Sequence, residues 1–154
     1  MRRETGRAVY IEVLVNDSSE ITEDDQIFYR QLAEVCENVT GEKPFLSYEI
    51  DSFEDKTEIE LYASIIVIVA DPRRIGESVG TRIAKQAGIP VLIIHQKIKE
   101  VYSLINKISW VWTISYEENR REVFDHFEDA ISDLFCFSEA EYENLFEFRG
   151  GYDV

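Results

Sequence analysis

Two short apolar runs on either side of a loop constrain the fold of this chain more than any other feature. Residues 65–69 (IIVIV) form an unbroken β-branched run, which is too short for a buried helix and typical of a parallel strand covered on both faces. Residues 91–94 (VLII) form a second run of this kind. Between them, Ser78 is suited to cap a helix over residues 79–87 and Gly88 to end it, so the segment predicts a strand-loop-helix-strand unit.

A right-handed crossover between these two strands determines where a ligand is expected. The loop 71–78 then follows the carboxyl end of the first strand, which is the edge at which open α/β sheets bind ligands. Arg73 and Arg82 bring positive charge to this loop and helix start, whereas the whole chain carries a formal net charge of −15. The contrast predicts a pocket that tolerates an anion in an otherwise acidic protein.

The rest of the chain repeats the alternation of strand and helix. Strands are expected over residues 9–15, 45–50, 65–69, 91–94 and 109–114, and helices over residues 23–38, 54–62, 79–87, 97–107 and 117–135. This order predicts the α/β class, with a single-domain Rossmann/flavodoxin-like fold whose five-stranded, mostly parallel sheet has helices on both faces. We divide the chain into an N-terminal extension (1–8), this domain (9–135) and an acidic and aromatic tail (136–154) with a short helix from Ser138 and a frayed end from Arg149.

Charge and apolar content argue against several classes of protein. A net charge of −15 argues against nucleic acid as a partner, because phosphate contacts supply most of that affinity. The longest apolar run is far shorter than the roughly 18 residues of a membrane span, and we expect no signal peptide. Cys36 and Cys136 stand far apart without a CxxC or a neighbouring histidine. We therefore expect a cytoplasmic protein with two reduced core cysteines, no metal site and no cofactor.

Several segments in a fixed order carry a family resemblance. They are EDDQIFYRQL (23–32), ASIIVIVAD (63–71), SVGTRIAKQAGIPVLII (78–94), YSLINK (102–107) and SYEENRREVFDHFEDAISDLF (115–135). Together they resemble the nucleoside 2-deoxyribosyltransferase family, and within it the branch of 2'-deoxynucleoside 5'-monophosphate N-glycosidases. The resemblance covers residues 9–135. It implies a nucleoside or nucleotide as the ligand and a homodimer as the assembly.

The residues expected to contact the ligand come from two segments. From the loop and the helix start after the third strand, these are Asp71, Arg73, Gly76, Ser78, Gly80 and Arg82. In relatives the pocket is completed by a neighbouring subunit, and Tyr102, Ser103 and Asn106 match that segment. Such enzymes use a glutamate nucleophile against the anomeric carbon of the sugar.

This chain departs from the family at the catalytic position itself. Arg82 stands where the family has its glutamate nucleophile, and a cation cannot attack an anomeric carbon. Gly76 replaces a serine that helps to hold the nucleotide phosphate. The first loop, residues 16–20 (NDSSE), carries two acids where the family has a glycine- and arginine-bearing phosphate loop, so it would repel a 5'-phosphate.

These departures leave several functions open. The first is a catalytically degenerate relative that binds a nucleoside or nucleotide through Arg73, Arg82 and the Ser78 helix start. The second is an active N-glycosidase or deoxyribosyltransferase with a relocated carboxylate, for which Glu77 is the nearest candidate. The third is an assembly domain, because the fold is related to Toll/interleukin-receptor homology domains. A fold without a ligand role, with Arg82 as a solvent-facing helix residue, is also open.

Two further features have both structural and functional interpretations. His95 ends the fourth strand at the expected ligand edge, where a general base would stand, but a lone histidine is more often structural. Trp110 and Trp112 share one face of the fifth strand by the strand period of two. For the tryptophans, core packing or a dimer face is favoured over a stacking platform for a base.

Overall fold

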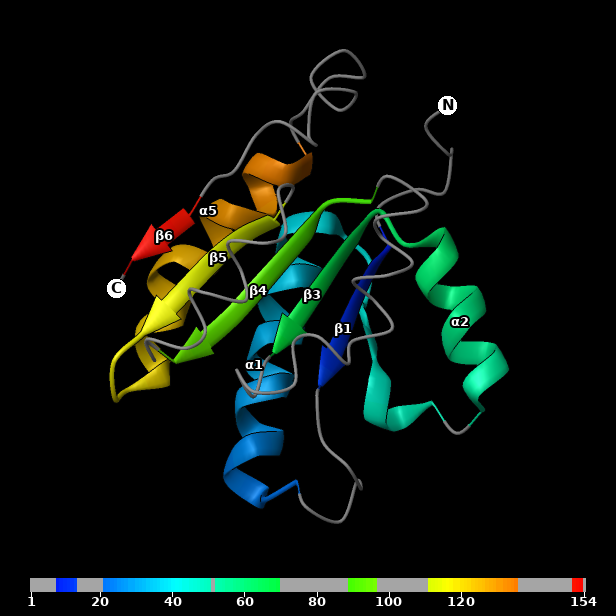
Figure 1. The fold of residues 1–154 in the computed structure, drawn as a ribbon, viewed down its shortest axis with the longest axis horizontal. Coiled ribbons are helices and arrows are strands. Elements are labelled where there is room, and N and C mark those ends of the chain that lie inside the picture. The colour runs from blue at the N-terminus through cyan, green and yellow to red at the C-terminus, as the bar shows by residue number, and fades with distance from the viewer. Residues whose placement is uncertain are drawn as a thin grey trace.

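The structure, a computed structural model, describes residues 8–13, 21–50, 52–69, 89–96, 111–135 and 151–153. Its sheet contains the strands β1 (Val9–Val13), β2 (Phe45–Leu46), β3 (Ile65–Val69), β4 (Val91–Gln96), β5 (Val111–Tyr116) and β6 (Gly151–Asp153). They lie in the order β2-β1-β3-β4-β5-β6, and every neighbouring pair is parallel (Figure 1). The predicted α/β fold with a parallel sheet is therefore confirmed.

Three α-helices accompany these strands in the described part of the chain. They are α1 (Glu23–Thr40), α2 (Phe53–Tyr62) and α5 (Phe124–Phe135), and short 3-10 turns stand at η2 (Ser47–Glu49) and η4 (Arg120–Val123). Helices α1 and α5 lie against the same face of the sheet (Figure 1). The helices expected over residues 79–87 and 97–107, and the one expected from Ser138, lie outside the described residues. No helix among the described residues is both long enough and apolar enough to cross a membrane.

The main core lies between α1, α5 and the sheet. Alternate strand residues face these helices, including Ile11, Val67 and Ile94, while their neighbours face the opposite side. Cys36 is fully buried in this core, as expected, and burial raises the pKa of its thiol to about 12. Trp112 is also buried there, which fits the packing interpretation. Cys136 and Trp110 lie outside the described residues.

The second strand is shorter than predicted. Pairing of β2 with β1 stops after Leu46, and the chain turns into η2 instead of continuing to residue 50. Ser47 explains this end, because its hydroxyl accepts a hydrogen bond from the Val13 N–H at 2.9 Å. A side chain thus takes the donor that a longer strand would have paired, as serine often does where secondary structure ends.

The end of the sheet around β5 also differs from the prediction. Strand β5 extends to Tyr116, two residues beyond its predicted end at residue 114. A helix was expected from residue 117, but there the Glu117 carbonyl accepts a hydrogen bond of 2.7 Å from the Gln96 side chain. The helical segment begins only after Asn119, whose side chain accepts from the Arg121 N–H at 3.0 Å. The frayed end expected from Arg149 is wrong as well, since residues 151–153 form β6 beside β5.

Candidate functional site

The strand order places a topological switch point between β1 and β3. Strand β1 has β2 on one side and β3 on the other. The connection after β1 therefore leads to one edge of the sheet, and the connection after β2 crosses back over β1 to β3 on the other side. With right-handed connections, the helices after these strands lie on opposite faces of the sheet. The carboxyl ends of β1 at Val13 and β3 at Val69 therefore lie at the edge where folds of this order usually bind ligands.

The ligand residues expected from the sequence, and the candidate carboxylate Glu77, all lie outside the described residues. In the segment between β3 and β4 these are Asp71, Arg73, Gly76, Glu77, Ser78, Gly80 and Arg82, and in the segment between β4 and β5 they are Tyr102, Ser103 and Asn106. The structure does describe the strands on either side of both segments.

Three buried polar residues share the sheet face opposite α1 and α5. Glu12 of β1, His95 of β4 and Ser115 of β5 are at most 8% exposed, and strand alternation directs all three away from the main core. His95 and Ser115 are direct neighbours in the β4–β5 register, close to the carboxyl ends of both strands. Across β3, ideal strand spacing puts the Cα atoms of Glu12 and His95 about 12 Å apart.

His95 has the position that the sequence predicts, near the carboxyl end of β4. Its Nδ1 lies 2.9 Å from the Gln96 carbonyl oxygen. Because a carbonyl oxygen only accepts hydrogen bonds, Nδ1 carries the proton, and in the neutral ring Nε2 is then the acceptor. In this tautomer Nε2, not Nδ1, is the basic nitrogen that a general base would use.

Glu12 and Ser115 were missed at the level of sequence. A signal for Glu12 does exist, since it is the one charged residue in the strand VYIEV, and charged side chains are seldom buried without a reason. Ser115 carries no such signal, because its burial depends on how far β5 extends. The predicted end of that strand at residue 114 leaves Ser115 out of the sheet altogether.

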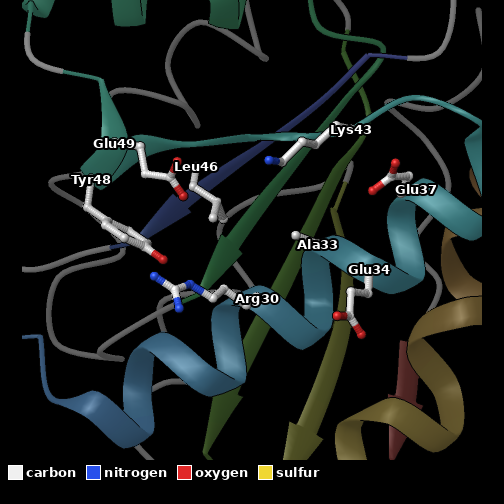
Figure 2. Close-up of a pocket in the computed structure, with 8 residues that line it drawn as sticks. All are labelled: Arg30, Ala33, Glu34, Glu37, Lys43, Leu46, Tyr48 and Glu49. Atoms are coloured by element: carbon white, nitrogen blue, oxygen red, sulfur yellow. The ribbon is translucent and has the colours of Figure 1, made fainter.

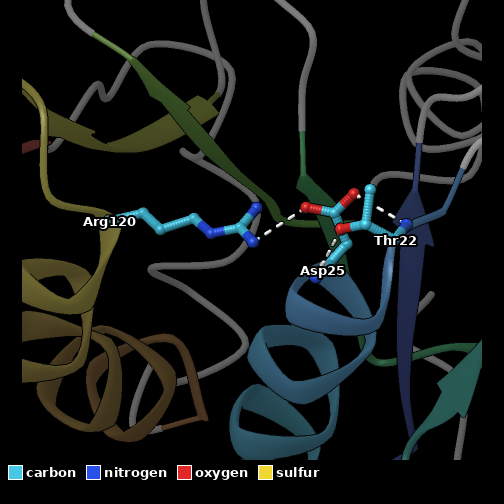
Figure 3. A network of polar contacts seen from close by, with 3 residues as sticks. All are labelled: Thr22, Asp25 and Arg120. Carbon is cyan, nitrogen blue, oxygen red and sulfur yellow. Dashed lines mark hydrogen bonds and ion pairs between the residues drawn. The ribbon is translucent and has the colours of Figure 1, made fainter.

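The beginning of α1 stands on the other side of the same sheet edge (Figure 3). Thr22 caps the helix through a reciprocal pair of hydrogen bonds with Asp25, each of 3.1 Å. Asp25 also makes an ion pair of 2.8 Å with Arg120, which follows β5. The Arg120 guanidinium lies 4.6 Å from the centre of the Phe28 ring, so the turn after β5 is held against α1 by charge and by a cation–π contact.

This helix start is a poor site for a phosphate. The first turn carries Glu23, Asp24 and Asp25, and the capping box already occupies the N–H groups of Thr22 and Asp25. Helix N-termini attract anions through free N–H groups and a partial positive charge, and here carboxylates take that position. The first turn of α1 would therefore repel a 5'-phosphate, as the sequence predicts for the loop before it.

Tyr29 and Tyr116 lie near Asp25 and Arg120, and Tyr48 packs against Tyr29. The rings of Tyr29 and Tyr48 are 5.7 Å apart, and Tyr116 ends β5. Burial, followed by the charge of Asp25, raises the pKa of Tyr29 to about 12. Burial likewise raises the pKa of Tyr116 above its ordinary value, although the Arg120 charge opposes part of the rise. These phenols stay protonated at neutral pH, so each is a hydrogen-bond donor rather than an anion.

Comparison with known proteins adds no family to this description. No protein-family model matches the chain, and no curated protein shows significant similarity to it. Within the described residues, no group of three or more histidine, cysteine, aspartate or glutamate side chains is arranged to hold a metal ion. The likeness to the deoxyribosyltransferase family therefore stays a prediction from the sequence segments that carry it.

Proposed function

We propose that this chain binds a nucleoside or nucleotide at the carboxyl edge of its sheet, between β1 and β3, without cleaving it. The strand order carries the proposal, because its reversal at β1 marks the edge at which parallel sheets of this order bind ligands. The family resemblance supplies the ligand class. Arg82 at the position of the family nucleophile is the reason to expect binding without catalysis.

The acidic start of α1 limits where a phosphate of such a ligand would lie. Its three carboxylates disfavour a phosphate beside β1, so a nucleotide would direct its phosphate toward Arg73 and Arg82 in the neighbouring segment. A neutral nucleoside has no such restriction. Comparing the affinity for each nucleoside with that for its 5'-monophosphate therefore reports whether the phosphate lies on the β1 side or on the side of Arg73 and Arg82.

Calorimetric titration with deoxynucleosides and their 5'-monophosphates tests the proposal. We expect measurable binding, at least about tenfold weaker for the monophosphate in Arg82→Ala, since that change removes one charge-assisted contact. The matched control is Arg121→Ala, an exposed arginine on η4. Absence of binding for every ligand, or equal monophosphate affinity in Arg82→Ala and the control, would overturn the proposal.

A second candidate function, hydrolysis of the N-glycosidic bond, is favoured by the buried polar groups on one sheet face. Glu12, His95 and Ser115 offer a carboxylate, an imidazole and a hydroxyl near the same edge. In this alternative Glu77 is the nucleophile. Chromatographic detection of free base distinguishes the two functions: release that Glu77→Gln abolishes establishes the enzyme, whereas activity that appears only in Arg82→Glu shows a pocket that has lost its nucleophile.

We also propose that the chain forms a homodimer. The support is the resemblance, in which Tyr102, Ser103 and Asn106 match a segment that completes the neighbouring pocket. Sedimentation equilibrium should give twice the chain mass of 18.0 kDa. A monomer at all concentrations would exclude both the dimer and an assembly role like that of Toll/interleukin-receptor domains.

A further inference from the structure

A cavity lies between α1 and the segment that contains β2 and η2, away from the sheet face of Glu12 and His95 (Figure 2). Its volume is about 600 Å³, within the range of about 300–1,000 Å³ that is usual for small-molecule sites. The buried side chains of Ala33 and Leu46 form its apolar floor. Charged side chains from both segments surround that floor: Arg30, Glu34, Glu37, Lys43 and Glu49.

The charged groups around this cavity are not matched with one another. None of the five makes an ion pair within 4.0 Å in the described part of the chain, although cations and carboxylates both face the cavity (Figure 2). A purely anionic ligand would meet three carboxylates, and a purely cationic ligand would meet Arg30 and Lys43. A ligand that carries both charges has a partner for each of its groups.

Tyr48 supplies a second, independent observation at one end of the cavity. Its hydroxyl oxygen is buried beside the Arg30 guanidinium (Figure 2). Because a guanidinium only donates hydrogen bonds, the Tyr48 O–H has no acceptor among the described residues. Burial and then the charge of Glu49 raise the pKa of this phenol, although the charge and hydrogen bonding of Arg30 oppose part of the rise, so the group keeps its proton at neutral pH. A buried O–H without an acceptor costs free energy, and a ligand that accepts its hydrogen bond would recover that cost.

We infer that this cavity binds a zwitterionic ligand of about dipeptide size. Its carboxylate accepts hydrogen bonds from the Arg30 guanidinium and the Tyr48 hydroxyl, an arrangement that suits the planar geometry of arginine. Its ammonium group lies at the opposite end beside Glu37, and an apolar side chain covers Ala33 and Leu46. Glu49 stands close to the carboxylate position and weakens binding by repulsion.

Three probes test this inference: L-alanyl-L-leucine, its N-acetyl form without the ammonium, and its C-terminal amide without the carboxylate. By calorimetry we expect the free dipeptide to bind at least about tenfold more tightly than either modified form. Arg30→Met and Tyr48→Phe should weaken the free dipeptide, whereas Glu49→Gln should tighten it. Glu37→Gln should weaken the free dipeptide but leave the N-acetyl form unchanged, because that form has no ammonium group.

The matched control for these variants is Arg121→Met, an exposed arginine on η4 that does not line this cavity. Thermal melts verify that each variant is folded, which is expected because the charged positions are exposed. Equal affinity for the three probes, or no binding by any of them, would overturn the inference. Loss of affinity in Arg121→Met as large as that in Arg30→Met would also overturn it.

Discussion

Asp25 joins the beginning of α1 to the turn after β5. Burial by itself acts to raise the pKa of this carboxyl, but its hydrogen bonds with Thr22 and Arg120 and the charge of Arg120 outweigh burial and lower it. A carboxyl whose pKa is lower in the folded chain than in the unfolded chain stabilises the fold when it is ionised. That stabilisation is present above the unfolded pKa of about 3.9 and is lost as the pH falls through the folded value.

We expect Asp25→Asn to lower the free energy of unfolding by about 1–2 kcal/mol at neutral pH, because it weakens both a helix cap and an ion pair. The difference from the native chain should shrink below about pH 4, where the native carboxyl becomes protonated. Urea unfolding at several pH values measures both effects. Asp24→Asn is the control, since Asp24 is exposed in the same first turn. Equal losses in the two variants would mean that only the charge at the helix start matters.

At the scale of elements, the best predicted part of the chain is α1. Its cap at Thr22, its acidic first turn and its inward stripe with Phe28, Leu32 and Cys36 follow the sequence pattern. Ile27 is the exception, because it precedes Phe28 in the same apolar spacing and is 48% exposed. Tyr29 and Ala33, which follow Phe28 and Leu32, are buried as well, and Ala33 lies on the side of α1 that faces β2 and η2.

The end of α1 depends on one glycine. Gly41 has φ 80° and donates to the Glu37 carbonyl at 2.8 Å, which closes the helix in a left-handed conformation. A Cβ atom there would meet no neighbour within 4 Å, so only backbone strain opposes a side chain. We expect Gly41→Ala to lower the free energy of unfolding by about 1 kcal/mol, and Gly41→Asn by less. Thermal or urea unfolding of the two variants tests this order. If a steric clash opposed the side chain, the larger asparagine would destabilise the fold more than alanine.

At the scale of the whole molecule, stability depends on the layer in which α1 and α5 cover the sheet. Leu32 is fully buried in that layer, whereas Ile27 on the same helix is half-exposed. We expect Leu32→Ala to cost about 2–5 kcal/mol of unfolding free energy and Ile27→Ala less than about 1 kcal/mol. The two variants remove comparable apolar groups from one helix. Similar losses in urea unfolding would show that Ile27 is buried in solution by another surface.

Part of the candidate site could be predicted from the sequence, and part could not. The placement of His95 at the carboxyl end of β4 was predictable, because a strand that ends at a polar residue can be recognised from its apolar run. The presence of Glu12 and Ser115 on the same face was not, because facing depends on the register of separate strands. The cavity beside α1 was not predictable either, since Arg30 and Tyr48 meet only across two different elements.

The sequence by itself determined the α/β class, the capped first helix and the parallel strands β3 and β4, because these features depend on neighbouring residues and on local hydrophobic period. Only the tertiary structure decided the strand order, the short β2, the added β6 and the late start of the last helix. Each of these depends on a partner far along the chain, such as the Ser47 hydroxyl on Val13 or the Gln96 amide on Glu117. Contacts between distant residues leave no periodic pattern in the sequence, and for this reason they appear only when the chain is folded.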